Sequence, residues 1–305
     1  MVKKEAFGEF EKYTISNDGI LVSVTTLGAT LTDVCFKGKN RVLSYGSPEE
    51  YLARKSYLCA IIGRYANRIE NAEFKLNGKL LKVTPNENGN QLHGGPDAFD
   101  RRKWKAEILD DNAVKFELFS PDGDNGYPGN LTATVIYSIF KDGFRITFEA
   151  ESDKDTLFAP TTHAYWQIDG SDVRDDVLTF DSEKYLPVDE RLIPTGDELE
   201  TADAFDFRSP KKVGGFFDHC FLLREGSDRK TVPALTLTGR DVTMELFTDF
   251  PAVQMYTGPI DGFDDYAGLA LEPEVVPNSP NMPGYESPVL KKGEKYSKFV
   301  EYRFK

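Results

Sequence analysis

The segment from Leu131 to Phe148, which reads LTATVIYSIFKDGFRITF, decides the fold class. On both sides of Asp142-Gly143, β-branched and aromatic residues alternate with polar ones. This period of two is typical of β-strands, because successive side chains point to opposite faces of a sheet. Asp-Gly is a pair suited to positive φ, so the segment predicts an antiparallel hairpin whose turn lies at Asp142-Gly143, with Lys141 leading in.

The same pattern recurs along the whole chain. Residues 74–76 and 79–83 flank Asn77-Gly78 and predict a second hairpin. Other short runs rich in β-branched and aromatic residues, bounded by turn residues, are 235–238, 242–247 and 299–304. No repeat, linker or composition shift divides the sequence. We therefore expect residues 1–305 to form one large, all-β antiparallel domain.

Helical and loop signals are few. Ser47 followed by Pro48 predicts the cap and first position of one short helical turn. Residues 276–284 contain three prolines and predict a loop at the margin of a sheet, where proline does not remove a ladder hydrogen bond. Loops of this kind often frame a functional site.

Composition and charge exclude several classes of partner. Lys and Arg number 37 against 50 Asp and Glu, giving a net charge of −13 that repels phosphate backbones and anionic lipid. The first nine residues lack an apolar signal region, and the longest apolar run, residues 57–62, is too short to cross a bilayer. The cysteines, Cys35, Cys59 and Cys220, are odd in number and lack CxxC spacing. We expect a cytoplasmic protein with buried free thiols, no structural metal, and neither nucleic acid nor membrane as a partner.

Proton-transfer chemistry is the best-supported function class from the residues alone. Phosphate-loop, dinucleotide, nucleophile-elbow and HExxH motifs are absent from the sequence. His163 and Tyr165 would share one face of a strand, and His93 lies beside two glycines. Imidazole is the side chain most easily tuned near neutral pH, and Glu272 with Glu274 adds carboxylates. A core role for either histidine, or a carboxylate pair for glycoside hydrolysis, explains the same residues.

The segment from Gly63 to Ile69 offers a second kind of contact. Arg64, Asn67 and Arg68 carry hydrogen-bond donors at fixed geometry, which suits sugar hydroxyls. Surface ion pairs account for the two arginines equally well. Asp122-Gly123-Asp124-Asn125-Gly126 is interpreted as a turn, because its glycine and the position of Ala133 do not match a calcium loop.

Taken together and in this order, these motifs resemble the aldose 1-epimerase (galactose mutarotase) family over nearly the whole chain. The matching segments are residues 63–69, 92–95, 122–129, 162–165, 185–189, 193–196, 205–208, 217–219, 253–258 and 271–272.

The resemblance implies a large antiparallel β-sandwich with few short helices, an aldose substrate and no cofactor. It implies that His163 is the general acid toward the ring oxygen and Glu272 the general base on the anomeric hydroxyl, with His93 bonding the sugar near its reacting end. It places substrate binding on four further residues: Asn67, Arg68, Asp218 and Gln254. His219 matches no functional position and is expected to be structural.

The chain departs from the family pattern at three positions. Thr162 and Gln167 stand where Asn is usual, and Glu274 stands where Gln is usual. We expect the first two to alter the support of His163, and Glu274 to add a charge beside the base. Three alternatives share part of this pattern: a hexose-6-phosphate 1-epimerase, a glycosidase that uses Glu272 and Glu274, and a sugar-binding β-sandwich without activity.

Overall fold

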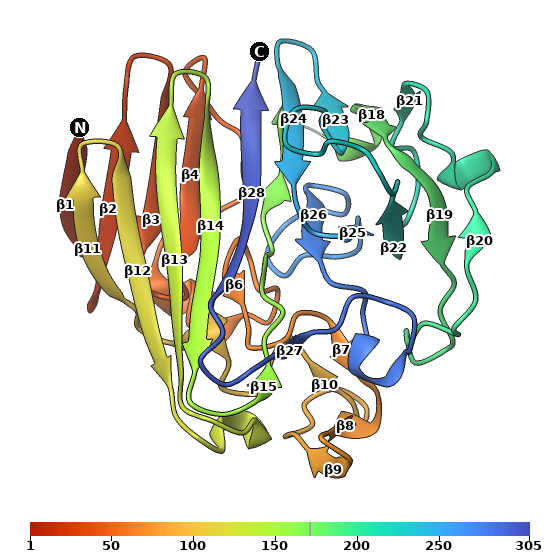
Figure 1. The fold of residues 1–305 in the computed structure, drawn as a ribbon. Coiled ribbons are helices and arrows are strands. Elements are labelled where there is room, and N and C mark those ends of the chain that lie inside the picture. The colour runs from red at the N-terminus through yellow and green to blue at the C-terminus, as the bar shows by residue number, and fades with distance from the viewer. Residues whose placement is uncertain (171) are drawn as a thin grey trace.

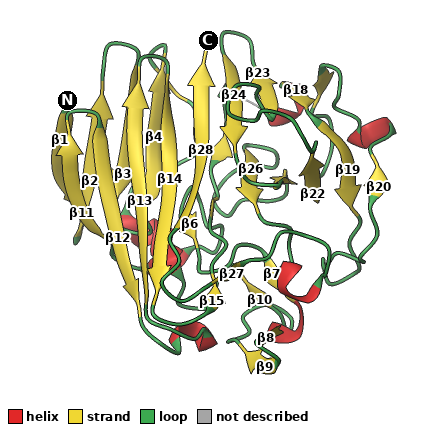
Figure 2. Cartoon of the chain, in the orientation of Figure 1, coloured by secondary structure: helices red, strands yellow, loops and turns green. Residues whose placement is uncertain are grey.

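The computed structural model describes residues 1–170 and 172–305, and strands make up most of its regular structure (Figures 1 and 2). The largest sheet is antiparallel and has nine strands. Their order is β11 (Lys105–Asp110), β12 (Ala113–Ser120), β13 (Leu131–Phe140), β14 (Gly143–Ser152), β28 (Tyr296–Phe304), β24 (Thr243–Thr248), β23 (Leu235–Thr238), β18 (Val177–Phe180) and β21 (Lys211–Lys212). The C-terminal strand β28 thus lies in the middle of this sheet (Figure 1).

A second sheet of five strands lies behind β11 to β14 in Figure 1. Its strands follow the chain: β1 (Val2–Phe7), β2 (Phe10–Ser16), β3 (Ile20–Thr25), β4 (Thr30–Phe36) and β5 (Lys39–Asn40). Tyr13 meets Phe116 edge to face at 5.9 Å, and the Tyr137 hydroxyl donates to the Ala29 carbonyl over 2.7 Å. The two layers therefore bury their apolar faces against each other, as expected of a sandwich.

A third sheet, of six strands, packs against the other half of the nine-stranded sheet. Its order is β17 (Tyr165–Trp166), β26 (Leu269–Glu274), β25 (Ala252–Tyr256), β22 (Asp218–Leu223), β19 (Ser182–Leu186) and β20 (Leu199–Glu200). Trp166 packs against Tyr302 at 4.6 Å, and Phe180 packs against Phe221 at 5.0 Å. Buried side chains from all three sheets join one large core, and a second, small cluster contains Leu186, Cys220, Ala252 and Val276.

The remaining elements of residues 1–170 and 172–305 are short. Four strand pairs are β6 (Ile61–Ile62) with β16 (Thr161–Thr162), β7 (Arg68–Ile69) with β10 (Gln91–Leu92), β8 (Glu73–Leu76) with β9 (Lys79–Lys82), and β15 (Thr156–Leu157) with β27 (Val289–Leu290). Six single 3-10 turns are η1 (Glu70–Ala72), η2 (Phe99–Arg101), η3 (Asp124–Gly126), η4 (Val173–Asp175), η5 (Asp203–Phe205) and η6 (Ser279–Asn281).

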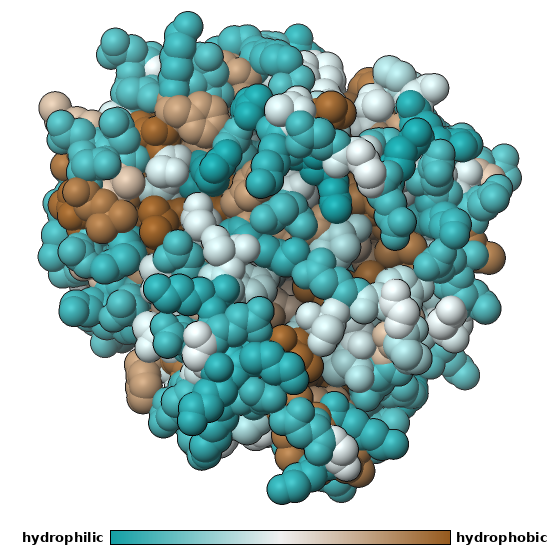
Figure 3. Space-filling view, viewed as in Figure 1, coloured by the Kyte–Doolittle hydropathy of each residue, from teal (hydrophilic) through white to brown (hydrophobic). Residues whose placement is uncertain are grey.

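The short helix α1 (Pro48–Ala53) begins as predicted. The Ser47 side chain accepts from the Glu50 N–H, and Pro48 occupies the first turn. In the part of the chain that the structure describes, no helix is long and apolar enough to cross a membrane. The face drawn in Figure 3 is mostly hydrophilic, with apolar residues scattered over it.

The hairpins are confirmed, but the turn of the longest one is shifted by one residue. At β8–β9, Asn77 and Gly78 both have positive φ, at 50° and 75°. At β13–β14, Phe140 pairs with Gly143, so the turn is Lys141-Asp142 and the prediction of Asp142-Gly143 is wrong. Glycine at position 143 allows the close approach of β28, because a Cβ there would lie 2.1 Å from the Tyr302 carbonyl oxygen.

The three cysteines carry free thiols. Cys59 and Cys220 are buried, as expected, whereas Cys35 is half-buried.

Candidate active site

The seven residues expected in the site surround one cleft of about 560 Å³ on the six-stranded sheet. Three of them stand on the adjacent strands β22, β25 and β26: Asp218, Gln254 and Glu272. The other four come from β7, β10 and β16 or the residues beside them: Asn67, Arg68, His93 and His163. Segments far apart in the sequence therefore meet because the sheet edges bring them together.

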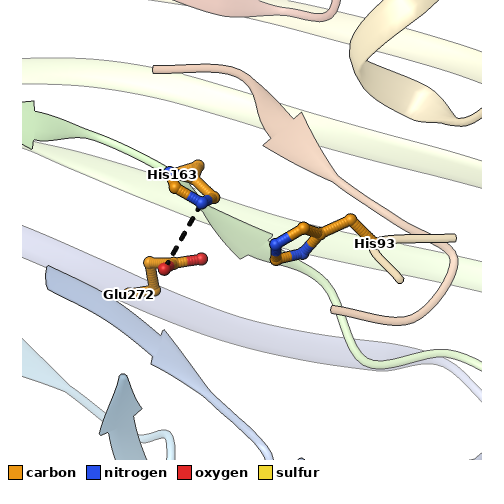
Figure 4. A group of neighbouring side chains, drawn as sticks. All are labelled: His93, His163 and Glu272. Carbon is orange, nitrogen blue, oxygen red and sulfur yellow. Dashed lines mark ion pairs between the residues drawn. The ribbon is translucent and has the colours of Figure 1, made fainter. Parts of the chain in front are cut away.

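His163 and Glu272 both line this cleft, and their side chains point toward each other (Figure 4). The His163 Nε2 and Glu272 Oε1 atoms lie 3.5 Å apart, and both side chains are buried. The His163 backbone is fixed by hydrogen bonds of 3.0 Å to residues 59 and 60 on the loop before β6. Its ring lies 4.9 Å from the Tyr165 ring, so the imidazole is held against an aromatic surface.

Burial determines the proton affinities of this pair. It lowers the pKa of His163 to about 4, and it raises the pKa of Glu272 well above its usual range, with the charges of Glu274 and Asp218 adding to the effect. The imidazolium form of His163 is disfavoured because it loses solvation when buried. A proton shared by the free pair resides mainly on Glu272.

His93 is oriented by Asn67. Its Nδ1 accepts the Asn67 main-chain N–H over 3.1 Å, and its own N–H donates to the Asn67 carbonyl over the same distance. Its φ is 51°, and the next residue, Gly94, also has positive φ at 87°, where a Cβ would lie 2.0 Å from the Gly63 carbonyl oxygen. The sharp turn at the end of β10 thus aims the imidazole at His163, with ring centres 5.2 Å apart.

Asn67 and Arg68 connect the cleft to two carboxylates. The Asn67 side-chain amide donates to Glu274 Oε1 over 3.0 Å. The Arg68 guanidinium donates to both oxygens of Glu87, at 2.6 and 2.9 Å. Most of the donor capacity of Arg68 is thus committed to Glu87, and its positive charge remains close to Glu274 and Asp218.

Asp218 and Gln254 act as one unit. The Gln254 amide donates to Asp218 Oδ1 over 2.6 Å, and burial raises the pKa of Asp218. The free edges of such a pair can bond sugar hydroxyls.

Several residues of the cleft were not predicted from the sequence. Tyr57 lies 4.6 Å from the His93 ring, and Tyr256 and Leu192 extend the apolar wall. Lys55 and Asp261 add one charge of each sign at the rim. Tyr256 lies in the matching segment 253–258, but the pattern there pointed to Gln254. The other four lie outside the matching segments, so the sequence carried no signal for them.

Other predicted candidates lie outside the cleft. Arg64 is buried, and its guanidinium donates to Ser120 and to the carbonyls of the 120–129 loop, where it fixes the turn that contains η3. Gln167 donates to the Ala267 carbonyl over 2.8 Å and does not line the cleft. His219 packs between aromatic rings, 4.8 Å from Phe205. The Thr162 hydroxyl and His163 Nδ1 are buried without partners among the described residues.

The ligand atoms of His93, His163 and Glu272, which the family resemblance assigned to one site, lie within 4.8 Å of one another. The cluster does not fit a metal ion. A histidine ligand needs a free lone pair, and its other nitrogen normally donates a hydrogen bond. The His93 Nδ1 instead accepts from Asn67, so a neutral His93 carries its proton on Nε2, the atom that faces the cleft. His93 is a hydrogen-bond donor here.

Comparison with known proteins agrees with this geometry. The family model for aldose 1-epimerase matches residues 11–303. An aldose 1-epimerase of Escherichia coli K12 is 39% identical, over 95% of this chain and 93% of its own length. A galactose mutarotase of Bos taurus is 32% identical, over 97% and 94%. The structure of galactose 1-epimerase from Lactobacillus acidophilus superposes with a TM-score of 0.91 at 30% identity, over 100% and 98%. This chain belongs to the aldose 1-epimerase family.

Proposed function

We propose that this protein interconverts the α- and β-anomers of free aldohexoses, with glucose and galactose as candidate substrates. The observation that carries the proposal is the His163–Glu272 pair, whose reacting atoms lie 3.5 Å apart in a cleft that polar side chains also line. Anomer exchange requires one group that gives a proton and one that takes a proton, and this pair supplies both.

The proposed reaction opens and recloses the sugar ring. Glu272 takes the proton of the C1 hydroxyl while His163 donates a proton to the ring oxygen, and the C1–O5 bond breaks. The aldehyde rotates about C1–C2, and the ring closes on its other face with the two roles reversed. The C1–O5 bond breaks and re-forms within the sugar and only protons pass between sugar and protein, so the chemistry needs no cofactor. Because the free pair keeps its proton mainly on Glu272, that proton passes to His163 before the ring opens.

The other cleft residues support this step. His93 donates from Nε2 toward the sugar near C1, while Asn67, Arg68, Asp218 and Gln254 bond its hydroxyls. Tyr57, Tyr165 and Tyr256 supply aromatic surface for the apolar face of the ring.

Two alternatives receive less support. A glycosidase would need Glu274 at the substrate, but Glu274 is 0% exposed and does not line the cleft. A sugar-phosphate epimerase would need a cationic pocket, but Arg68 is already paired with Glu87, which leaves Lys55 as the other cation of the lining.

We also propose that residues 1–305 act as one domain, since one large core joins the three sheets. The free thiols suit a reducing, cytoplasmic setting.

Polarimetry tests the proposal directly. Freshly dissolved α-glucose or α-galactose should reach its equilibrium rotation much faster with the protein than in buffer alone. A sugar-binding protein without activity would bind the same sugars, measured by calorimetry, and leave the rotation to change at the solvent rate.

A further inference from the structure

Two carboxylates lie side by side on one buried strand. Glu272 and Glu274 are two residues apart on β26, so their side chains leave the same face of the sheet. They are 2% and 0% exposed, respectively. Two such charges in one buried place repel each other strongly, so one carboxylate ionises well before the other.

Their surroundings differ in a way that selects which one ionises first. Glu274 Oε1 accepts a hydrogen bond of 3.0 Å from the Asn67 amide, a contact that favours the ionised form. Glu272 receives no comparable donor among the described residues. Its Oε1 lies 3.5 Å from His163 Nε2, and the Oε2 atoms of both glutamates lack a hydrogen-bond partner there, so the Asn67 bond is the difference between the two side chains. The Asn67 contact therefore stabilises a charge on Glu274 alone.

Charged and titratable groups of the surrounding elements also affect the ionisation of Glu272 and Glu274. Arg68 on β7 attracts a negative charge at either carboxylate, while Asp218 on β22 repels it. Tyr65 and Cys220 also face Glu274, and burial raises the pKa of each, so both are neutral near pH 7. Because Arg68 is also paired with Glu87, its attraction is partly offset and does not balance two anions in one buried pair.

We propose that Glu274 is a positioning residue that carries the negative charge of the buried pair and thereby keeps the shared proton on Glu272 and His163. The inference rests on the proposed anomerisation. The Glu272–His163 pair works with one proton: with none it has no acid, and with two it has no base. A negative charge on Glu274 raises the proton affinity of both Glu272 and His163. It therefore moves the acidic and the alkaline limb of the pH–activity profile to higher pH.

Glu274→Gln tests this, since glutamine keeps the shape and the oxygen that accepts from Asn67 but removes the charge. The interaction between the Glu274 charge and the pair follows from a separation of two residues along a strand and an effective dielectric near 20. Loss of this interaction should move both limbs of the pH profile of kcat/KM down by about one to two pH units. Glu301→Gln is the matched control, because Glu301 is also buried but pairs with Arg145 and Arg303 on the nine-stranded sheet, outside the cleft. Its profile should superpose on that of the wild type.

An unshifted or upward-shifted profile in Glu274→Gln would overturn the inference. The anomerisation proposal would survive that result, because it fails only when wild-type protein leaves the solvent rate unchanged. Carbon-13 NMR of protein labelled at the glutamate carboxyls gives a second test that needs no activity. Wild type at pH 7 should show one protonated buried carboxyl, and Glu272→Gln should abolish that signal. If the signal persists, Glu274 holds the proton and the inference is wrong.

Discussion

The main-chain N–H of Asn67 donates to Nδ1 of His93 over 3.1 Å, and this bond sets the role of the histidine. Burial lowers the pKa of His93 well below 6.5, and the neighbouring His163 and Arg68 lower it further. A neutral ring that accepts at Nδ1 carries its hydrogen on Nε2. His93 is therefore a fixed donor over a wide pH range, and the proton exchanged in the reaction must come from the His163–Glu272 pair.

Replacing Glu272 by Gln should lower kcat by about two orders of magnitude or more, because glutamine keeps the shape of the side chain but cannot accept the C1 proton. Sugar should still bind, since the proposed hydroxyl contacts come from other residues. Kinetics by polarimetry and binding by calorimetry separate the two effects. A folded variant with near-normal kcat would exclude Glu272 as the base.

The buried His163 should make the fold less stable in acid. Its pKa is about 4 in the folded protein and near 6.5 in the unfolded chain, so the unfolded chain takes up the proton first as the pH falls. The resulting loss in the free energy of unfolding is absent above pH 6.5 and reaches about 3 kcal/mol by pH 4. Denaturant unfolding of wild type and His163→Asn between pH 7 and pH 4 should show wild type losing that much more stability.

The pKa values of Glu272 and Glu274 are raised, so protonation of these groups stabilises the fold as the pH falls. Wild type and His163→Asn both contain these glutamates, so this contribution to stability largely cancels in the comparison. His219→Asn is the control for loss of an imidazole. Burial lowers the pKa of His219 too, but this residue is only half-buried, so the difference from wild type should be smaller. Parallel stability curves for wild type and His163→Asn would contradict the prediction.

The sequence predicted the features of this protein that depend on local pattern. Alternation in segments such as residues 131–148 is visible because a half-buried strand needs one apolar face. The family resemblance also named seven site residues from distant segments, which meet in one cleft, but other features decided by distant neighbours were missed. Gly143 reads as a turn residue but is required by the approach of Tyr302 on β28, and Arg64 reads as a sugar contact but fixes the 120–129 loop. The proton affinity of His163 depends on burial, which no motif records.

Treatment with EDTA should leave the anomerisation rate unchanged. The grouped side chains of His93, His163 and Glu272 invite the opposite expectation, but the Asn67 donor occupies His93 Nδ1 and leaves its proton on Nε2. A chelator titration followed by addition of Zn²⁺ measures this. If EDTA abolished the activity and Zn²⁺ restored it, the imidazole ring of His93 would have to rotate by a half-turn and bind the ion.

Free sugars should be better substrates than sugar phosphates. A phosphate carries close to two negative charges at neutral pH, and its binding requires cations with free donors. The Arg68 guanidinium is bonded to Glu87 at 2.6 and 2.9 Å, and the exposed Lys55 shares the rim of the cleft with Asp261. Together with Asp218, the carboxylates of Glu87 and Asp261 repel a dianion, on a chain of net charge −13. We expect kcat/KM for glucose or galactose to exceed that for glucose 6-phosphate, and the ratio to fall as salt screens the repulsion.

Anomerisation of both substrates at low and high ionic strength measures the ratio. A preference for the phosphorylated sugar that weakens with salt would require Arg68 to leave Glu87 for the ligand, and would assign the protein to sugar-phosphate substrates.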